Sequence, residues 1–162
     1  MAAASRLAVG VVVLVVGLLS FAGGWLSGRA GLFMSVPAAS LDERERAFTE
    51  RMQHAVLDGW FTVDGREAPP RPDRYEIASV EKVGDGLWRF NAHLVHEGMD
   101  ATLPIVVPVQ WVGDTPMVML TDYSIPSLGT FTARVFFYDT RYAGTWQHGD
   151  QVGGQLFGRI EH

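Results

Sequence analysis

The first hydrophobic pattern along the chain is an uncharged, apolar stretch at residues 7–26, flanked by Arg6 and Arg29. A run of about 20 such residues is long enough to cross the hydrocarbon core of a membrane as a helix. It predicts a single-pass protein of the cell membrane, with a short tail inside and the rest of the chain outside the cytoplasm. A cleaved signal peptide is the alternative, because Ser20 and Ala22 form a small-x-small pair that a signal peptidase accepts.

The next periodic segment has helical spacing. Ser40 and Glu43 form a capping-box pattern, in which the hydroxyl accepts a backbone N–H of the first turn and the carboxylate accepts the N–H of the capping residue. Apolar side chains then recur every three or four residues. The pattern predicts one amphipathic helix over residues 41–58, with Phe48 and Met52 on its buried face.

From Tyr75 onward the hydrophobic positions alternate, which is typical of β-strands separated by turns. The clearest hairpin joins residues 75–83 and 87–95 through a Gly-Asp-Gly turn. The proline-rich segment 66–73 before it is expected to be a loop. Further strands are expected at residues 103–112, 117–121, 130–138, 142–147 and 155–160.

Two prolines mark one of these strands. Pro104 and Pro108 have the same parity along residues 103–112, so both missing N–H groups point toward the same neighbouring strand. That strand should lie at an edge of the sheet, or be unpaired on one side at these positions.

One helix followed by consecutive strands indicates an α+β fold. We expect residues 1–29 to form the membrane anchor, or a signal peptide, and residues 30–39 to form a tether. Residues 40–162 should form a single α+β domain, in which the amphipathic helix packs on a curved antiparallel sheet of about 5 to 7 strands.

This packing makes a specific prediction about the core. Phe48 and Met52 should be buried against strand residues such as Trp88, Phe90 and Val107. The alternative architecture is a small closed β-barrel with the helix plugging one end.

Composition narrows the function classes. The chain has no cysteine, which excludes disulfides, thiolate metal ligands and a thiol nucleophile. From Ala30 onward the acidic residues outnumber the basic ones, for a formal charge of about −7. Binding to a phosphate backbone is therefore not expected, and nucleic acid is not an expected partner.

Metal-ligand residue types cluster once in the sequence, at His93, His96, Glu97 and Asp100. Residues three apart in a strand point to opposite faces, so His93 and His96 cannot bind one ion together. Neither a metal nor a cofactor is expected.

Candidate binding residues lie in the C-terminal half, where loops and turns follow the strands. The set consists of polar and aromatic side chains: Asp122, Tyr123, Arg141, Trp146 and His148. A polar pocket that also uses Tyr142 and Gln147 is one interpretation of the segment that follows Arg141.

The other interpretation of this segment is structural. Glycines among strands commonly serve turns and the close approach of a neighbouring backbone, while aromatic residues fill the core. Trp146 is then expected on the inner face of the sheet, and Gly153, Gly154 and Gly158 are expected to allow a neighbouring strand to approach.

The end of the chain contains Tyr142-Ala-Gly-Thr-Trp146 followed by Gly153-Gly154-x-x-Phe157-Gly158. With these motifs, roughly the last 60 residues resemble a group of uncharacterised bacterial membrane-anchored proteins with a small β-rich C-terminal domain. The resemblance implies no activity and no functional residue. The order of helix and strands is also similar to cystatin-like and NTF2-like folds, which is a likeness of architecture alone.

The absence of a catalytic constellation favours a membrane-tethered, non-catalytic accessory domain that binds another envelope component. The alternative function is a small-ligand-binding domain, or an enzyme, that uses the candidate binding residues. A deep pocket with those side chains converging on it would favour the alternative, whereas a Trp146 packed in the core would favour the accessory domain.

Overall fold

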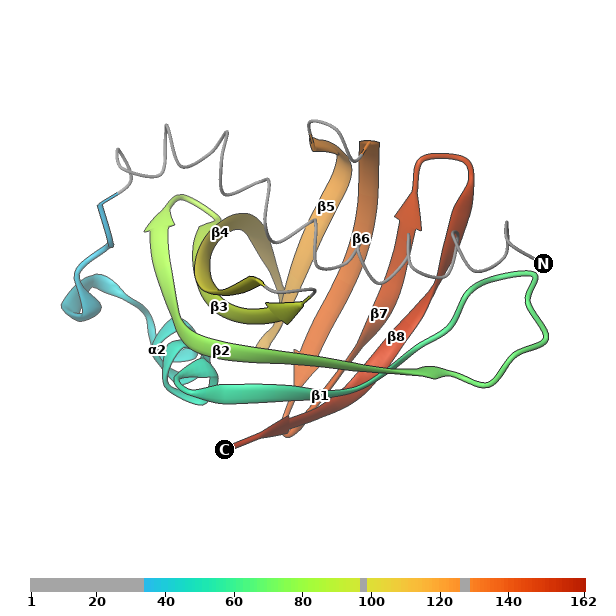
Figure 1. Cartoon of the computed structure of the whole chain (residues 1–162). Coiled ribbons are helices and arrows are strands. Elements are labelled where there is room, and N and C mark those ends of the chain that lie inside the picture. The colour runs from blue at the N-terminus through green and yellow to red at the C-terminus, as the bar shows by residue number, and fades with distance from the viewer. Residues whose placement is uncertain (1–33, 97–98, 126–128) are drawn as a thin grey trace.

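The computed structural model describes residues 34–96, 99–125 and 129–162. Eight antiparallel strands form one closed barrel, in which each strand pairs with the next along the chain and β8 pairs with β1 (Figure 1). The strands are β1 Ala55–Phe61, β2 Arg71–Gly84, β3 Leu87–His96, β4 Met99–Val112, β5 Thr115–Ile125, β6 Gly129–Tyr138, β7 Arg141–His148 and β8 Val152–Glu161.

The α-helix α2, Glu43–Met52, follows the short 3-10 turn η1, Ala38–Ser40. Its capping box lies two residues later than predicted: Asp42 accepts the N–H of Glu45 at 2.9 Å, and Glu45 accepts the N–H of Asp42 at 3.1 Å. The Ser40 hydroxyl instead donates to the Pro37 carbonyl, and Asp42 is the capping residue of the helix.

The helix ends at Met52, earlier than predicted. His54 has a φ of 54°, a left-handed conformation that cannot continue an α-helix. Ala55 then begins β1, in which alternate residues are buried. The apolar residues after Met52 therefore belong to a strand, although their spacing also fits a helix.

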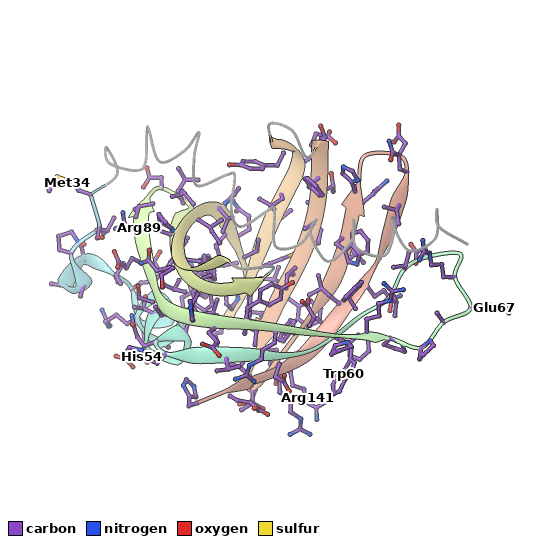
Figure 2. All side chains as sticks on the ribbon, viewed as in Figure 1. Met34, His54, Trp60, Glu67, Arg89 and Arg141 are labelled. Atoms are coloured by element: carbon purple, nitrogen blue, oxygen red, sulfur yellow. The ribbon has the colours of Figure 1, made fainter. Side chains whose placement is uncertain are left out.

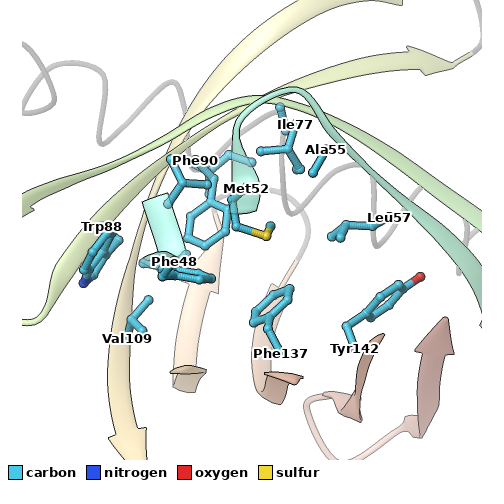
Figure 3. Close-up of a cluster of buried hydrophobic side chains, with 14 of the residues drawn as sticks. Phe48, Met52, Ala55, Leu57, Ile77, Trp88, Phe90, Val109, Phe137 and Tyr142 are labelled. Carbon is cyan, nitrogen blue, oxygen red and sulfur yellow. The ribbon is translucent and has the colours of Figure 1, made fainter. Parts of the chain in front are cut away.

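The helix α2 closes one end of the barrel, which we call the helix end (Figures 1 and 3). The turns at residues 85–86 and 139–140 also lie there. Phe48 is fully buried, with ring centroids 5.4 Å from Trp88 and 6.2 Å from Phe90. Met52 and Val107 belong to the same cluster. The predicted burial of Phe48 and Met52 is thus confirmed.

Polar contacts hold the same helix to the barrel wall. Glu45 is buried, and its carboxylate accepts a hydrogen bond from the Lys82 ammonium at 2.6 Å. The Arg44 guanidinium lies over the Trp111 ring, 5.0 Å from its centroid. These contacts fix α2 against β2 and β4.

The ladder between β4 and β5 is short. It joins only Val109–Val112 to Thr115–Val118 among the described residues, whereas β3 and β4 are paired from Leu87 to His96. The unpaired part of β4 begins at Pro108, which has no N–H to donate. The sequence prediction that this strand is unpaired on one side at its prolines is confirmed.

The predicted α+β class is wrong. The described residues form a closed eight-stranded antiparallel barrel with one short α-helix, not a helix packed on an open sheet. It matches the alternative architecture, a barrel plugged by a helix. The loop predicted over residues 66–73 is also wrong for its last three residues, because β2 begins at Arg71.

The sequence also predicted a single-pass membrane protein. In the described part of the chain, no helix is long and apolar enough to cross a membrane. The anchor predicted over residues 1–29 lies outside the described residues.

Candidate functional site

An apolar cavity of about 180 Å³ lies inside the barrel. Every strand contributes at least one residue to its lining, which is aliphatic and aromatic except for the tyrosine hydroxyls. Representative residues from strands spaced around the barrel are Leu57, Phe90, Ile105, Leu120, Ala133 and Tyr142.

The cavity exists because inward positions away from the helix end carry small side chains. On β3, the inward positions change from Trp88 and Phe90 to Ala92. On β6, Phe137 at the helix end gives way to Ala133. A second aromatic cluster, formed by Phe61, Phe131 and Trp146, fills the opposite part of the barrel. The cavity therefore lies between two packed layers.

One polar group of the lining has no hydrogen-bond partner. The Tyr142 side chain is only 2% exposed, and its hydroxyl finds no partner in the part of the chain that the structure describes. A buried hydroxyl without a partner loses its bonds to water with no compensation, which costs free energy. A water or a ligand in the cavity would satisfy this hydroxyl.

Two glycines make the space in which the Tyr142 ring lies. Gly59 and Gly158 face each other across the β1–β8 ladder. A Cβ on Gly59 would come 2.6 Å from the Tyr142 hydroxyl oxygen, and one on Gly158 would come 2.7 Å from a carbon of the ring. Side chains at these positions would displace the tyrosine, so the closing seam of the barrel is shaped around it.

A carboxylate lies next to this tyrosine. Asp73 is the register partner of Gly59, and its Oδ2 accepts a hydrogen bond of 2.7 Å from the Tyr75 hydroxyl. Tyr75 also lines the cavity. Asp73, Tyr75 and Tyr142 thus form one polar cluster, which we call the tyrosine–aspartate cluster.

Burial sets the protonation of this cluster. It raises the pKa of Asp73 to about 6, although the hydrogen bond from Tyr75 opposes the shift. Burial, followed by the charge of Asp73, raises the pKa of Tyr75 and also that of Tyr142 above the usual value for a phenol. At neutral pH both phenols are therefore protonated donors beside a charged carboxylate.

A larger recess of about 420 Å³ lies on the surface at the β7–β8 hairpin. Its lining is mostly polar and includes Asp64, Thr145, Gln147, Asp150 and Gln155. Because it is formed largely by exposed, polar side chains, it offers a ligand little exclusion from water.

The structure does not bring all five predicted binding residues together. Tyr123 and His148 both pair in register with Phe131, and the His148 ring stacks on the Phe131 ring at 4.6 Å. Arg141 lies near the opposite end, at the turn between β6 and β7, and its side chain points away from the barrel (Figure 2). Asp122 is exposed on β5.

Asp122 has a structural environment of its own. It has a φ of 46° and lies where the β5–β6 register shifts, and its N–H donates to the Thr132 hydroxyl at 3.1 Å. Only Tyr123 of the five predicted residues lines the interior cavity, and burial raises the pKa of its hydroxyl.

Trp146 lies in the core, as expected, with 5% of its surface exposed and its ring 6.3 Å from Phe61. The expected role of the nearby glycines is also confirmed. A Cβ on Gly154 would come 2.0 Å from the Thr62 carbonyl oxygen, and one on Gly158 would come 2.3 Å from the Asp58 carbonyl oxygen. Side chains there would force the adjacent chain away.

The cluster of metal-ligand residue types does not assemble in the described residues, where no three histidine, aspartate or glutamate side chains could hold one ion. His93 instead lies beside Glu76, with Nδ1 3.2 Å from a carboxylate oxygen.

Asp73 and Tyr75 were missed from the sequence. The signal was present, since Asp73, Tyr75 and Ile77 alternate with the exposed Pro72 and Arg74 and so share the inner face of β2. Tyr75 and Ile77 fell within a predicted strand, but Asp73 was assigned to the proline-rich loop, which concealed that it continues the same alternation.

No protein-family model, no curated protein and no solved structure matches the chain.

Proposed function

We propose that this protein is a non-catalytic binding domain that holds a small, mostly apolar molecule inside its barrel. The observation that carries the proposal is the interior cavity, lined by all eight strands and containing the buried, unpartnered Tyr142 hydroxyl. Ligand pockets are commonly apolar enclosures with a few placed polar groups, and this cavity has that composition. This role corresponds to the alternative function considered from the sequence, a small-ligand-binding domain, although only Tyr123 of the predicted binding residues lines this cavity.

The size of the cavity limits the ligand. An apolar cavity of about 150 Å³ in a protein core stays dry and accepts benzene. At about 180 Å³, the cavity here suits a single ring with a short substituent, or a short chain. A drug-sized molecule needs a pocket of about 300 Å³ or more.

The chemistry of the lining favours binding over catalysis. Among the described lining residues there is no serine, histidine or lysine, and so no nucleophile paired with a base. The carboxylate closest to the cavity, that of Asp73, accepts a hydrogen bond from Tyr75. The cavity therefore supplies shape, exclusion of water and hydrogen-bond donors.

The test is a thermal unfolding series of the full chain with increasing ethylbenzene. A ligand that binds only the folded state should raise the melting temperature by about 3 °C or more at ten times its dissociation constant. Ala133→Leu places three additional carbons in the cavity and should abolish the shift.

The matched control is Ala143→Leu. This residue alternates with the inward-facing Tyr142 on β7, so the same enlargement lies outside the barrel. The control should keep the ligand-induced shift. No shift in the unsubstituted protein, or an undiminished shift in Ala133→Leu, would rule out binding in the cavity.

A further inference from the structure

The short ladder between β4 and β5 places an interruption in the barrel wall beside the cavity. Beyond Val109 and Val118 the two strands are not paired in the described residues. The unpaired portions supply Ile105, Val106 and Val107 from β4, and Leu120 and Tyr123 from β5, to the cavity lining. No other pair of adjacent strands has so short a ladder in the part of the chain that the structure describes.

The backbone of β4 disfavours closing this interruption. The Val109 N–H donates to the Gly86 carbonyl at 2.8 Å, so odd-numbered residues of β4 direct their backbone groups toward β3. Even-numbered residues therefore direct theirs toward β5. Pro104 and Pro108 are both even-numbered, and neither can donate a hydrogen bond across to β5.

The cavity extends into the interruption. Ile105 and Val107 share the inner face of β4. The Val106 side chain, between them in sequence, points to the outer face. All three line the cavity, so it passes between the strands and reaches the outward-directed valine. The Val106 side chain is itself only 5% exposed, and the side chains that line the cavity at this interruption are mainly apolar.

The tyrosine–aspartate cluster lies on the opposite wall. Tyr142 packs over Gly59 and Gly158 at the β8–β1 seam, which is diametrically across the strand order from the β4–β5 seam. A molecule that passes between β4 and β5 would meet Tyr142 with its leading end and keep its remaining atoms among aliphatic side chains. The charged Asp73 nearby would repel an anionic leading group.

We propose that the cavity is loaded sideways, between β4 and β5, by neutral molecules that carry one hydroxyl or carbonyl group on an apolar body, and that the Tyr142 hydroxyl binds that polar group. The proposal rests on the proposed function, since it names the entrance and the ligand class of the same cavity. Alcohols and ketones of about eight non-hydrogen atoms fit this description, whereas carboxylates do not.

The ligand class is tested with three probes of similar size: benzyl alcohol, ethylbenzene and benzoate. The full chain should bind benzyl alcohol roughly ten times more tightly than ethylbenzene at pH 8, because one buried hydrogen bond is gained. Benzoate should bind more weakly than benzyl alcohol by a similar factor. Tyr142→Phe removes only the hydroxyl oxygen, and should reduce the alcohol preference to less than twofold while leaving ethylbenzene binding unchanged.

The entrance is tested by exchange rates measured from NMR line shapes. Replacing Pro104 and Pro108 with valine supplies two N–H donors toward β5, so the ladder can lengthen. Association and dissociation of benzyl alcohol should both slow at least tenfold, with the dissociation constant changed less than threefold. Val106→Phe narrows the passage without altering the backbone, and should also slow exchange if the proline variant fails to fold.

Pro72→Val is the control for the proline substitution. Pro72 is exposed on β2, paired with Trp60 and away from the β4–β5 seam, so exchange should keep its original rate. Unchanged rates in both seam variants would overturn the lateral entrance, and an alcohol preference that survives Tyr142→Phe would overturn the assigned contact. Failure of every probe to bind the unsubstituted protein would instead overturn the proposed function itself.

Discussion

At the helix end of the barrel, large rings fill the interior: Phe48 of α2 packs against Trp88 and Phe90, and all three are buried. Farther along the same strands, the inward positions carry Ala92 and Ala133, and a cavity of about 180 Å³ takes the place of side chains. The same eight strands thus support a packed region and a hollow region. The strand side chains form most of the core, and α2 completes it at one end by adding Phe48 and Met52.

The polar groups divide in the same way. At the helix end, the buried Glu45 is paired with Lys82, so its charge is compensated. Beside the cavity, Tyr142 has no partner among the described residues, and burial raises the pKa of Asp73. The first region is arranged for stability, whereas the second leaves a buried hydroxyl for the ligand that we propose.

The largest expected effect is in the packed region. Phe48→Ala removes a fully buried ring that contacts several other aromatic rings, and should lower the free energy of unfolding by about 3 to 5 kcal/mol. Urea unfolding followed by tryptophan fluorescence measures the loss. A loss below about 1 kcal/mol would mean that α2 is not part of the core.

The next effect depends on pH. Burial raises the pKa of Asp73 to about 6 from its ordinary value of 3.8, so the folded state binds a proton more tightly than the unfolded state. Stability from this group is present below about pH 4 and is lost as the pH rises through about 6. Asp73→Asn removes the charge and keeps an acceptor for Tyr75.

The Asp73→Asn variant should therefore be more stable than the unsubstituted protein at pH 8. The expected gain is about 1 to 3 kcal/mol, because each tenfold difference in proton affinity between the folded and unfolded states is worth about 1.36 kcal/mol. The gain, measured by urea unfolding at each pH, should fall to near zero at pH 4. Asp64→Asn is the control, because it makes the same substitution at an exposed position. A constant difference across the pH range would contradict a buried carboxylate at position 73.

The smallest expected effect compares the same substitution in the hollow region and in the packed region. Ala133→Leu enlarges a residue that faces the cavity, so it should change the free energy of unfolding by less than about 1 kcal/mol in either direction. Ala55→Leu makes the same enlargement at a buried position outside the cavity lining, where overpacking typically costs about 1 to 3 kcal/mol. Equal costs for the two variants, measured by urea unfolding, would mean that the interior is not hollow.

The sequence predicts the contacts of this fold better than its closure. The hairpin of β2 and β3, the burial of Phe48 and the consequence of Pro104 and Pro108 all follow from local spacing. Closure does not, because the alternation of inward and outward residues is the same in an open sheet and in a barrel. It also depends on β1, whose apolar residues fit a helical repeat as well as a strand.

The cavity lies beyond what local patterns can predict. It depends on Ala92 and Ala133 being at similar depths on different strands, which requires the registers of the whole barrel. The predicted binding residues were chosen for their chemical type and their position near loops. Neither criterion tests whether residues meet in space, and Arg141 lies at the turn between β6 and β7, away from the others. Tyr142 was recognisable as a polar aromatic residue, but its partner-free hydroxyl required the structure.

The most direct measurement is a crystal structure of the full chain under xenon pressure. Xenon occupies apolar cavities that are large enough and dry, and its scattering locates it without assumptions about the natural ligand. A xenon peak inside the barrel, in contact with Leu120, Ala133 and Tyr142, is the predicted result. A barrel interior without xenon, with side chains or ordered water filling the space between the two aromatic clusters, would contradict the account.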